Sequence, residues 1–223
     1  MLVHCALCMR AFGPIRNSAQ FSIGESKVIT YERSGRNEST DTQTYAVERE
    51  IEDIEALIND NGGSALVTGF SSGAALALEA AAHGLNITKL ALYEPPFMVS
   101  NEGHQAPADS QQQLQAMINE NRRSDAVKFF MKDMIGLPSL IVFIMKIMPV
   151  WSKLKNVAHT LPYDAAIMGD CSLPEKEAGS VKMPALISSG GKSPATMQQA
   201  MKKLSEVIPN GQLKILKGET HNV

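Results

Sequence analysis

The chain has 223 residues, of which 44% are hydrophobic and 20% are charged, enough for one globular domain with a sizeable core. Its 21 basic and 23 acidic residues give a formal net charge of -2. This balance offers no chain-wide field that would collect nucleic acid or an anionic membrane, so the expected partner is a small, neutral or weakly charged molecule.

The N-terminal stretch MLVHCALCMRAF has neither a basic start nor a long apolar run. No secretory signal is therefore expected, and the expected location is cytoplasmic. Cys5 and Cys8 form a C-x-x-C pair, but no second Cys/His pair at ligand spacing completes a tetrahedral zinc site. We expect no metal and no cofactor.

Strands and helices alternate along most of the sequence. A short apolar run at 2–4 and an alternating run at 27–33 predict strands. The segment 42–63 predicts a helix, because Val47, Ile51, Ile54 and Ile58 recur at helical spacing. Further strands are predicted at 64–70, 87–94, 183–191 and 212–218, with helices at 72–84 and 194–211. Such alternation is typical of a mostly parallel sheet with helices on both faces.

The alternation stops between 97 and 179, where the composition becomes helical. We predict a core formed by 1–96 plus 180–223 and a helical cap inserted at 97–179. The apolar run from Met134 to Trp151 is divided by prolines and a lysine into pieces too short to span a membrane. It is predicted to line a pocket as a lid.

The stretch GFSSG at 69–73 lies directly after a predicted strand and directly before a predicted helix, and it fits the pattern G-x-S-x-G. In such a turn the central residue, Ser71, is held in a strained backbone with its hydroxyl exposed above the sheet. Neither a Gly-Lys-Ser/Thr phosphate loop nor a G-x-G-x-x-G pattern is present. The stretch therefore favours a serine nucleophile over a nucleotide cradle.

With this turn the sequence resembles the α/β-hydrolase family over nearly its whole length. LVHCALC, YERSGRNEST, GGKSP and GETH look like the family's oxyanion, arginine, acid and histidine segments. The resemblance implies an α/β-hydrolase fold with a mostly parallel sheet of about six strands, helices on both faces and a helical cap. It also implies a Ser-His-acid triad with Ser71 as nucleophile and His221, after the last predicted strand, as base.

The same resemblance implies that backbone amides of Ser72 and Ala6 form the oxyanion hole. Cys5 stands where the family has a glycine, and a cysteine in a positive-φ conformation would misplace the amide that follows it. His4 lies at a strand end near the expected site, where it orients a loop more often than it acts as base.

The acid is the least determined member of the triad. In GGKSP, Ser193 occupies the place of the family's usual aspartate, and no carboxylate occurs between Glu177 and Glu206. Glu94 ends the strand that follows the nucleophile, at the sheet edge where sites assemble, so we predict that it orients His221. Asp164 and Asp170 are the alternatives.

Together these features predict a carboxylesterase-like serine hydrolase that acts on small acyl or aromatic esters through an acyl-enzyme. Two alternatives stay open: a non-catalytic or weakly active ligand-binding protein of the same fold, and a carbon-carbon bond hydrolase or lyase on the same site. The family's two leading strands and its closing helix have no counterpart in the sequence. This leaves an exposed sheet edge through which the chain could form a homo-oligomer.

Overall fold

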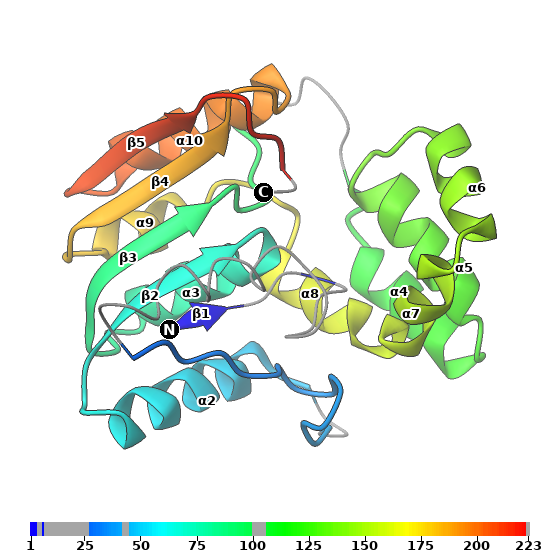
Figure 1. The fold of residues 1–223 in the computed structure, drawn as a ribbon, viewed down its shortest axis with the longest axis horizontal. Coiled ribbons are helices and arrows are strands. Elements are labelled where there is room, and N and C mark those ends of the chain that lie inside the picture. The colour runs from blue at the N-terminus through cyan, green and yellow to red at the C-terminus, as the bar shows by residue number, and fades with distance from the viewer. Residues whose placement is uncertain (4–5, 7–26, 42–44, 100–105, 222–223) are drawn as a thin grey trace.

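The computed structural model describes residues 1–3, 6, 27–41, 45–99 and 106–221. Within these ranges one parallel sheet has the order β1-β2-β3-β4-β5, with hydrogen-bonded neighbours following chain order (Figure 1). Parallel neighbours need crossover connections, which is why helices separate the strands in sequence. The strands are β1 (Leu2–Val3), β2 (Ala65–Phe70), β3 (Ile87–Tyr93), β4 (Ala185–Gly190) and β5 (Gly211–Leu216).

The prediction of a parallel sheet flanked by helices is confirmed, with five strands among the described residues where about six were expected. The difference lies at 27–33, where only Thr30 forms an isolated parallel bridge, to Leu2. The Leu2 amide donates to the Ile29 carbonyl at 2.9 Å, and among the described residues the two-residue strand β1 forms no other bridge to this segment.

The main core forms where helices pack onto the sheet. These helices are α2 (Val47–Asp60), α3 (Ser72–Ala82), α9 (Glu175–Ser180) and α10 (Ala195–Val207). Ile51, Ile54 and Ile58 of α2 are buried, as their helical spacing predicted. Helix α3 is buried along most of its length, because its alanines allow close approach to β2 and β3. This packing fixes the N-terminus of α3 at the carboxyl edge of the sheet.

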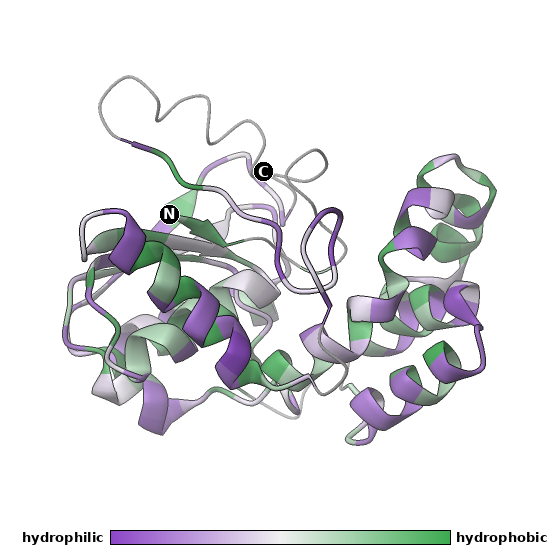
Figure 2. Cartoon of the chain, turned by 90° about the horizontal axis from the view of Figure 1, so that it is seen from below, coloured by the Kyte–Doolittle hydropathy of each residue, from purple (hydrophilic) through white to green (hydrophobic). Residues whose placement is uncertain are grey.

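A second body of helices stands beside the sheet (Figures 1 and 2). It has its own apolar core, which includes Leu114, Phe130, Trp151, Leu154 and Leu161. Its elements are α4 (Ser110–Asn119), α5 (Arg123–Phe129), the π-helical turn η1 (Phe130–Met134), α6 (Ser139–Ile147), α7 (Val150–Asn156), the 3-10 turn η2 (Ala158–Thr160) and α8 (Leu161–Met168).

Helix α8 joins the two bodies, since it packs against α4 on one side and α3 on the other. Helix α9, within the predicted insertion, packs instead against α3 and α10, and its Ala178 belongs to the main core. We refer to α4 through α8 as the cap. The boundary of the cap at residue 179 stays a prediction.

The apolar run at 134–151 is interrupted where expected, with Pro138 directly before α6 and Pro149 directly before α7. In the part of the chain that the structure describes, no helix has the length and apolar character needed to cross a membrane. Met134, Val142 and Trp151 are buried in the cap core. The prediction that this run lines a pocket does not hold for most side chains of α6, which are exposed to solvent.

Candidate active site

The turn between β2 and α3 holds Ser71 in a strained conformation. Its φ is 53° and its ψ is -125°, a combination that non-glycine residues adopt at a cost of about 1–3 kcal/mol. A Cβ added to Gly69 would lie 2.4 Å from the Gly73 carbonyl oxygen, so the turn closes only with glycine there. The Ser71 amide donates to the Tyr93 carbonyl at 2.9 Å, which ties the turn to the end of β3.

Ser72 is the first residue of α3, and its amide therefore has no partner within the helix. An amide at this position, reinforced by the helix dipole, suits a developing negative charge. The second predicted oxyanion residue, Ala6, lies in a turn, is half-buried and packs against the cap core. His4, Cys5 and Cys8 lie outside the described residues.

Glu94 and His221 are brought together from positions 127 residues apart. His221 Nδ1 lies 2.7 Å from Glu94 Oε2. A carboxylate only accepts, so the ring nitrogen donates, which leaves Nε2 free to act as an acceptor. Glu94 is fully buried, whereas the His221 side chain is 43% exposed. A buried carboxylate in this position fixes the orientation of the imidazole ring.

The other oxygen of Glu94 accepts two further hydrogen bonds, from the Ser189 hydroxyl at 2.6 Å and from the Gly190 amide at 2.8 Å. Burial by itself raises the pKa of the Glu94 carboxyl, but His221, Ser189, Ser193 and the Gly190 amide favour its charged form, and the pKa falls to about 2. The Ser193 hydroxyl is close enough to act on this charge but has no hydrogen bond of good geometry. Glu94 is therefore ionised at neutral pH.

The loop after β4 and the last residue of β3 both bind the backbone of the histidine loop. The Lys192 amide donates to the Glu219 carbonyl at 2.9 Å, and the Tyr93 hydroxyl donates to the Thr220 carbonyl at 2.5 Å. A Cβ on Gly190 would lie 2.6 Å from the Glu219 carbonyl oxygen, so a side chain there would push the loop away. The segment GGKSP thus supplies no acid but positions both Glu94 and the backbone beside His221.

No hydrogen bond joins Ser71 to His221 within the described part of the chain. In free enzymes the contact between nucleophile and base is often long and tightens when substrate binds. Both residues follow strand ends at the carboxyl edge of the sheet, where the Tyr93 backbone and side chain contact the turn of one and the loop of the other.

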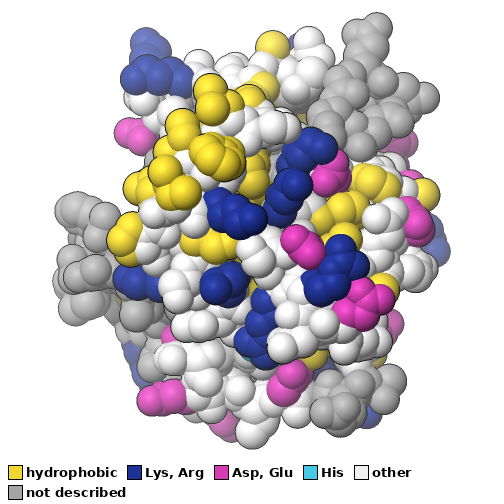
Figure 3. All heavy atoms as spheres, turned by 90° about the vertical axis from the view of Figure 1, so that its right-hand side faces the viewer, with side chains coloured by type: hydrophobic (Ala, Val, Ile, Leu, Met, Phe, Trp, Pro, Cys, Tyr) yellow, Lys and Arg dark blue, Asp and Glu magenta, His cyan; other side chains and the backbone are white. Residues whose placement is uncertain are grey.

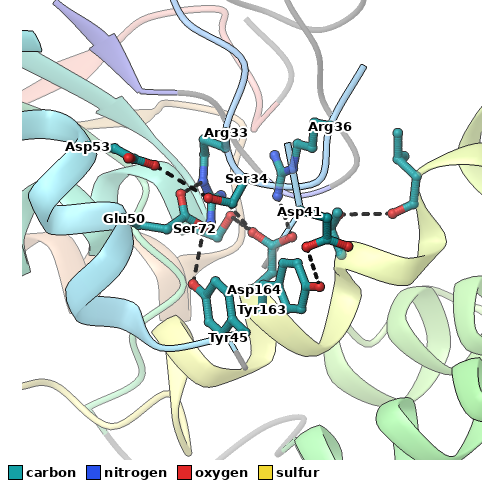
Figure 4. Close-up of polar contacts among 12 residues, drawn as sticks. Arg33, Ser34, Arg36, Asp41, Tyr45, Glu50, Asp53, Ser72, Tyr163 and Asp164 are labelled. Atoms are coloured by element: carbon teal, nitrogen blue, oxygen red, sulfur yellow. Dashed lines mark hydrogen bonds and ion pairs between the residues drawn. The ribbon is translucent and has the colours of Figure 1, made fainter. Parts of the chain in front are cut away.

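A second buried carboxylate, Asp164 of α8, contacts Ser72 at the start of α3 (Figure 4). It accepts from the Ser72 hydroxyl at 2.9 Å, from Arg33 at 2.8 Å and from Arg36 at 2.6 Å. All four side chains are fully or almost fully buried. Burial raises the pKa of Asp164, but the two guanidinium groups outweigh it and hold the pKa below its usual range. Asp164 is thus bound to arginines and not to His221.

The network extends to α2 through Glu50, which accepts two hydrogen bonds from Arg33, each 2.7 Å long. The Tyr45 hydroxyl donates to the same carboxylate at 3.1 Å, and the Tyr45 ring stacks on Tyr163 of α8 at a centroid distance of 4.1 Å. Four charges, two of each sign, therefore compensate one another beside the N-terminus of α3. We call Arg33, Arg36, Glu50 and Asp164 the arginine network.

The arginine network was not predicted from the sequence. One signal was present, because Glu50 lies three residues after Val47 and four before Ile54, on the buried stripe of α2. A carboxylate on such a stripe requires a buried cationic partner. The role of Ser189 was missed as well, and the only sign of it was a polar pair at the buried end of a strand.

The remaining candidates lie away from this arrangement. Asp170 accepts from the Ser172 amide at 2.8 Å and is exposed. His83 Nδ1 lies 2.8 Å from the carbonyl of Glu79, one turn earlier in α3. His159 Nε2 lies 2.7 Å from the Gly35 carbonyl. Among the described residues, no group of three or more His, Cys, Asp or Glu side chains is arranged to hold a metal ion.

Comparison with solved structures places the chain among known proteins. An α/β hydrolase from Sphaerobacter thermophilus is 45% identical over 100% of this chain and 86% of its own, with a TM-score of 0.91. MenH from S. aureus is 18% identical over 99% of this chain and 85% of its own, with a TM-score of 0.66. A carboxylesterase of Nitrososphaera gargenis is 14% identical over 99% and 81%, also with a TM-score of 0.66. These two more distant likenesses concern the fold alone.

No protein-family model matches the sequence, and no curated protein matches it. The family relationship therefore depends on the α/β hydrolase from Sphaerobacter thermophilus, which is 45% identical over the entire length of this chain.

Proposed function

The chain belongs to the α/β-hydrolase family, and from this premise we propose that it is a serine hydrolase of carboxylesterase type, with Ser71 as nucleophile, His221 as base and Glu94 as the acid that orients the base. The proposed substrates are small acyl or aromatic esters. The amides of Ser72 and Ala6 are the proposed oxyanion donors.

In the proposed reaction, Ser71 Oγ attacks the ester carbonyl while its proton passes to His221 Nε2. The carbonyl oxygen becomes an oxyanion that the two amides stabilise. Collapse of this intermediate expels the alcohol, which takes the proton from His221, and leaves an acyl group on Ser71. Water, deprotonated by the same histidine, then releases the acid and restores the serine. Glu94 stays ionised throughout and stabilises the imidazolium.

The observation that carries the proposal is the backbone of Ser71. A positive φ in a serine between a strand and a helix is costly, and packing around Gly69 and Gly73 enforces it. A tight turn alone would be satisfied by glycine at that position. Placing serine there suits a hydroxyl that must stand above the sheet edge and beside the first amides of α3.

Support for the base comes from the opposite side of the site. The 2.7 Å contact with Glu94 sets one tautomer of His221, and 43% exposure of its side chain leaves the ring open to a substrate. The proposed preference for esters is supported by the acyl-transfer chemistry that a Ser-His-acid site performs.

The test is labelling with a fluorophosphonate probe together with hydrolysis of a short p-nitrophenyl ester. Wild-type protein should be labelled and should release p-nitrophenol. Ser71→Ala should abolish labelling and lower turnover by about five to six powers of ten, the loss seen when a nucleophile is removed from a triad. Ser64→Ala, which removes an exposed serine directly before β2, is the matched control and should behave as wild type.

Labelling of Ser71→Ala to the wild-type level would exclude Ser71 as nucleophile. Labelling of the wild type without ester turnover would retain the nucleophile but reject the ester, and would direct attention to a carbon-carbon bond substrate. Absence of both would favour a binding protein of this fold.

A further inference from the structure

Helix α6 exposes an apolar stripe at the outer edge of the cap. Leu140, Phe143, Ile144 and Ile147 follow the spacing i, i+3, i+4, i+7, which is the spacing of a helix face that normally packs on a core. Their side chains are instead exposed, with 69% of Leu140, 63% of Phe143 and 73% of Ile147 accessible to solvent. Only Val142 of this helix is buried.

The packing contacts of α6 leave the apolar stripe uncovered. Helix α6 packs on α7 and on η1, through Val142 and Met145. It lies on the side of the cap away from the sheet (Figure 1). Two further apolar residues are exposed nearby in the chain, Ile135 before α6 and Met148 directly after it. A row of exposed apolar side chains along one helix face marks an interaction site.

The charge around the stripe is strongly one-sided. Residues 128–155 contain five lysines and a single acidic residue, Asp133, a formal charge of +4 in a chain whose total is -2. Asp133 lies 3.4 Å from Lys132, so this acid is already beside a lysine. Lys128, Lys132, Lys146 and Lys153 are exposed. Figure 3, which views the molecule from the cap side, shows apolar side chains gathered next to lysine and arginine side chains.

We propose that α6 and its flanking lysines dock the protein onto the surface of an anionic phospholipid bilayer. An apolar helix stripe with lysines around it matches the chemistry of that surface, where acyl chains accept the side chains and headgroups attract the cations. With nine residues, α6 lies in the interface and does not cross it. The expectation of no membrane contact came from the chain-wide charge, which conceals this asymmetry.

A second copy of the chain fits the stripe less well. A two-fold interface brings the same patch of both copies together, so it would place the two lysine-rich segments against each other. Repulsion between like charges opposes that contact, whereas anionic lipid neutralises them. Docking is independent of the proposed esterase reaction, because none of its residues belongs to the candidate active site.

The experiment is co-sedimentation of the full chain with large vesicles of phosphatidylcholine alone or mixed with phosphatidylglycerol. We expect binding to the mixed vesicles, at least about tenfold weaker binding to phosphatidylcholine, and loss of binding at high salt, because salt screens the headgroup attraction. The combined variant Phe143→Ser with Ile147→Ser should weaken binding by at least about tenfold, since it removes two apolar anchors.

Leu66→Ser is the matched control, because Leu66 is 48% exposed on β2 and lies outside the cap. It should bind mixed vesicles as wild type does. Fluorophosphonate labelling and circular dichroism of each variant keep folding and the active site separate from docking. Lys128→Glu with Lys146→Glu should reduce binding to mixed vesicles without changing the far-ultraviolet spectrum.

Equal binding to both vesicle types, or undiminished binding of the Phe143→Ser, Ile147→Ser variant, would overturn the proposal. So would sedimentation velocity showing a wild-type dimer that this variant dissociates while neither protein binds vesicles, since the stripe would then be a contact between copies.

Discussion

Two fully buried carboxylates flank the turn at Ser71, and they are stabilised in different ways. Glu94 has neutral donors around one oxygen and a half-exposed histidine on the other. Asp164 has two buried guanidinium groups and one hydroxyl. Both have a pKa below the ordinary value, the first chiefly through hydrogen bonds and the second chiefly through opposite charge.

The different partners of Glu94 and Asp164 suit the two carboxylates to different roles. A carboxylate facing a histidine with access to solvent can tune a proton acceptor, because its partner is free to change protonation state. A carboxylate bound by two arginines cannot do so, since arginine keeps its charge. Asp164 instead connects α8 of the cap to the first residue of α3. We infer that Glu94 affects the rate of reaction and Asp164 affects the stability of the fold.

Among substitutions at the two carboxylates, Glu94→Gln should have the largest effect on the reaction rate. The amide would keep the hydrogen bonds from Ser189 and the Gly190 amide but would favour the wrong tautomer of His221, so kcat for an activated ester should fall by about four powers of ten. Unfolding by urea should change far less. Ser193→Ala, in the neighbouring loop after β4, should keep kcat within a fewfold. Wild-type kcat in Glu94→Gln would place the acid elsewhere.

Asp164→Asn should produce the opposite result. It removes the charge that pairs with both Arg33 and Arg36 while these side chains stay buried, so the unfolding free energy should drop by about 3–5 kcal/mol, measured by denaturant titration. The control is Asp170→Asn, at an exposed position. If Asp164→Asn unfolds like wild type while losing turnover, the assignment of the two carboxylates is reversed.

Acid should weaken the fold through both groups. When the pKa of a group is lower in the folded state than in the unfolded state, its charged form stabilises the fold. This contribution is complete at pH values above the unfolded-state pKa and is lost as the pH falls through the folded-state pKa. For Glu94 the window runs from 4.5 down to about 2. The fall in unfolding free energy across this window should be shallower in Glu94→Gln than in wild type, and unchanged in the exposed control Glu206→Gln. Parallel curves for all three proteins would contradict the low pKa of Glu94.

Ser72→Ala should have the smallest effect. Its amide stays in place, but Asp164 loses the hydrogen bond from the Ser72 hydroxyl, which should cost about 1–2 kcal/mol of unfolding free energy. Turnover should fall by less than about tenfold, with Ser64→Ala as reference for both measurements. A loss comparable to that of Ser71→Ala would mean that the Ser72 hydroxyl takes part in the chemistry.

Local sequence patterns determined the elements and part of the candidate site. The stripe of α2, the turn at GFSSG and the alternation of strands and helices each depend on residues a few positions apart, and the structure has them where the sequence predicted. Glu94 was selected because GGKSP contains no carboxylate, and it lies beside His221. Its role in catalysis stays a prediction.

Only the tertiary structure decided the long-range partners. Ser189 meets Glu94 across 95 residues, and Arg33 and Arg36 meet Asp164 across 131 and 128 residues. A periodic pattern contains no information about such distances, because chain folding and not spacing brings these groups together. The orientation of α6 is a second example. The sequence indicated that 134–151 is apolar and helical, but only the packing of α6 on α7 and η1 determined that its stripe faces outward. Periodicity fixes which side chains share a face, and tertiary contacts fix where that face points.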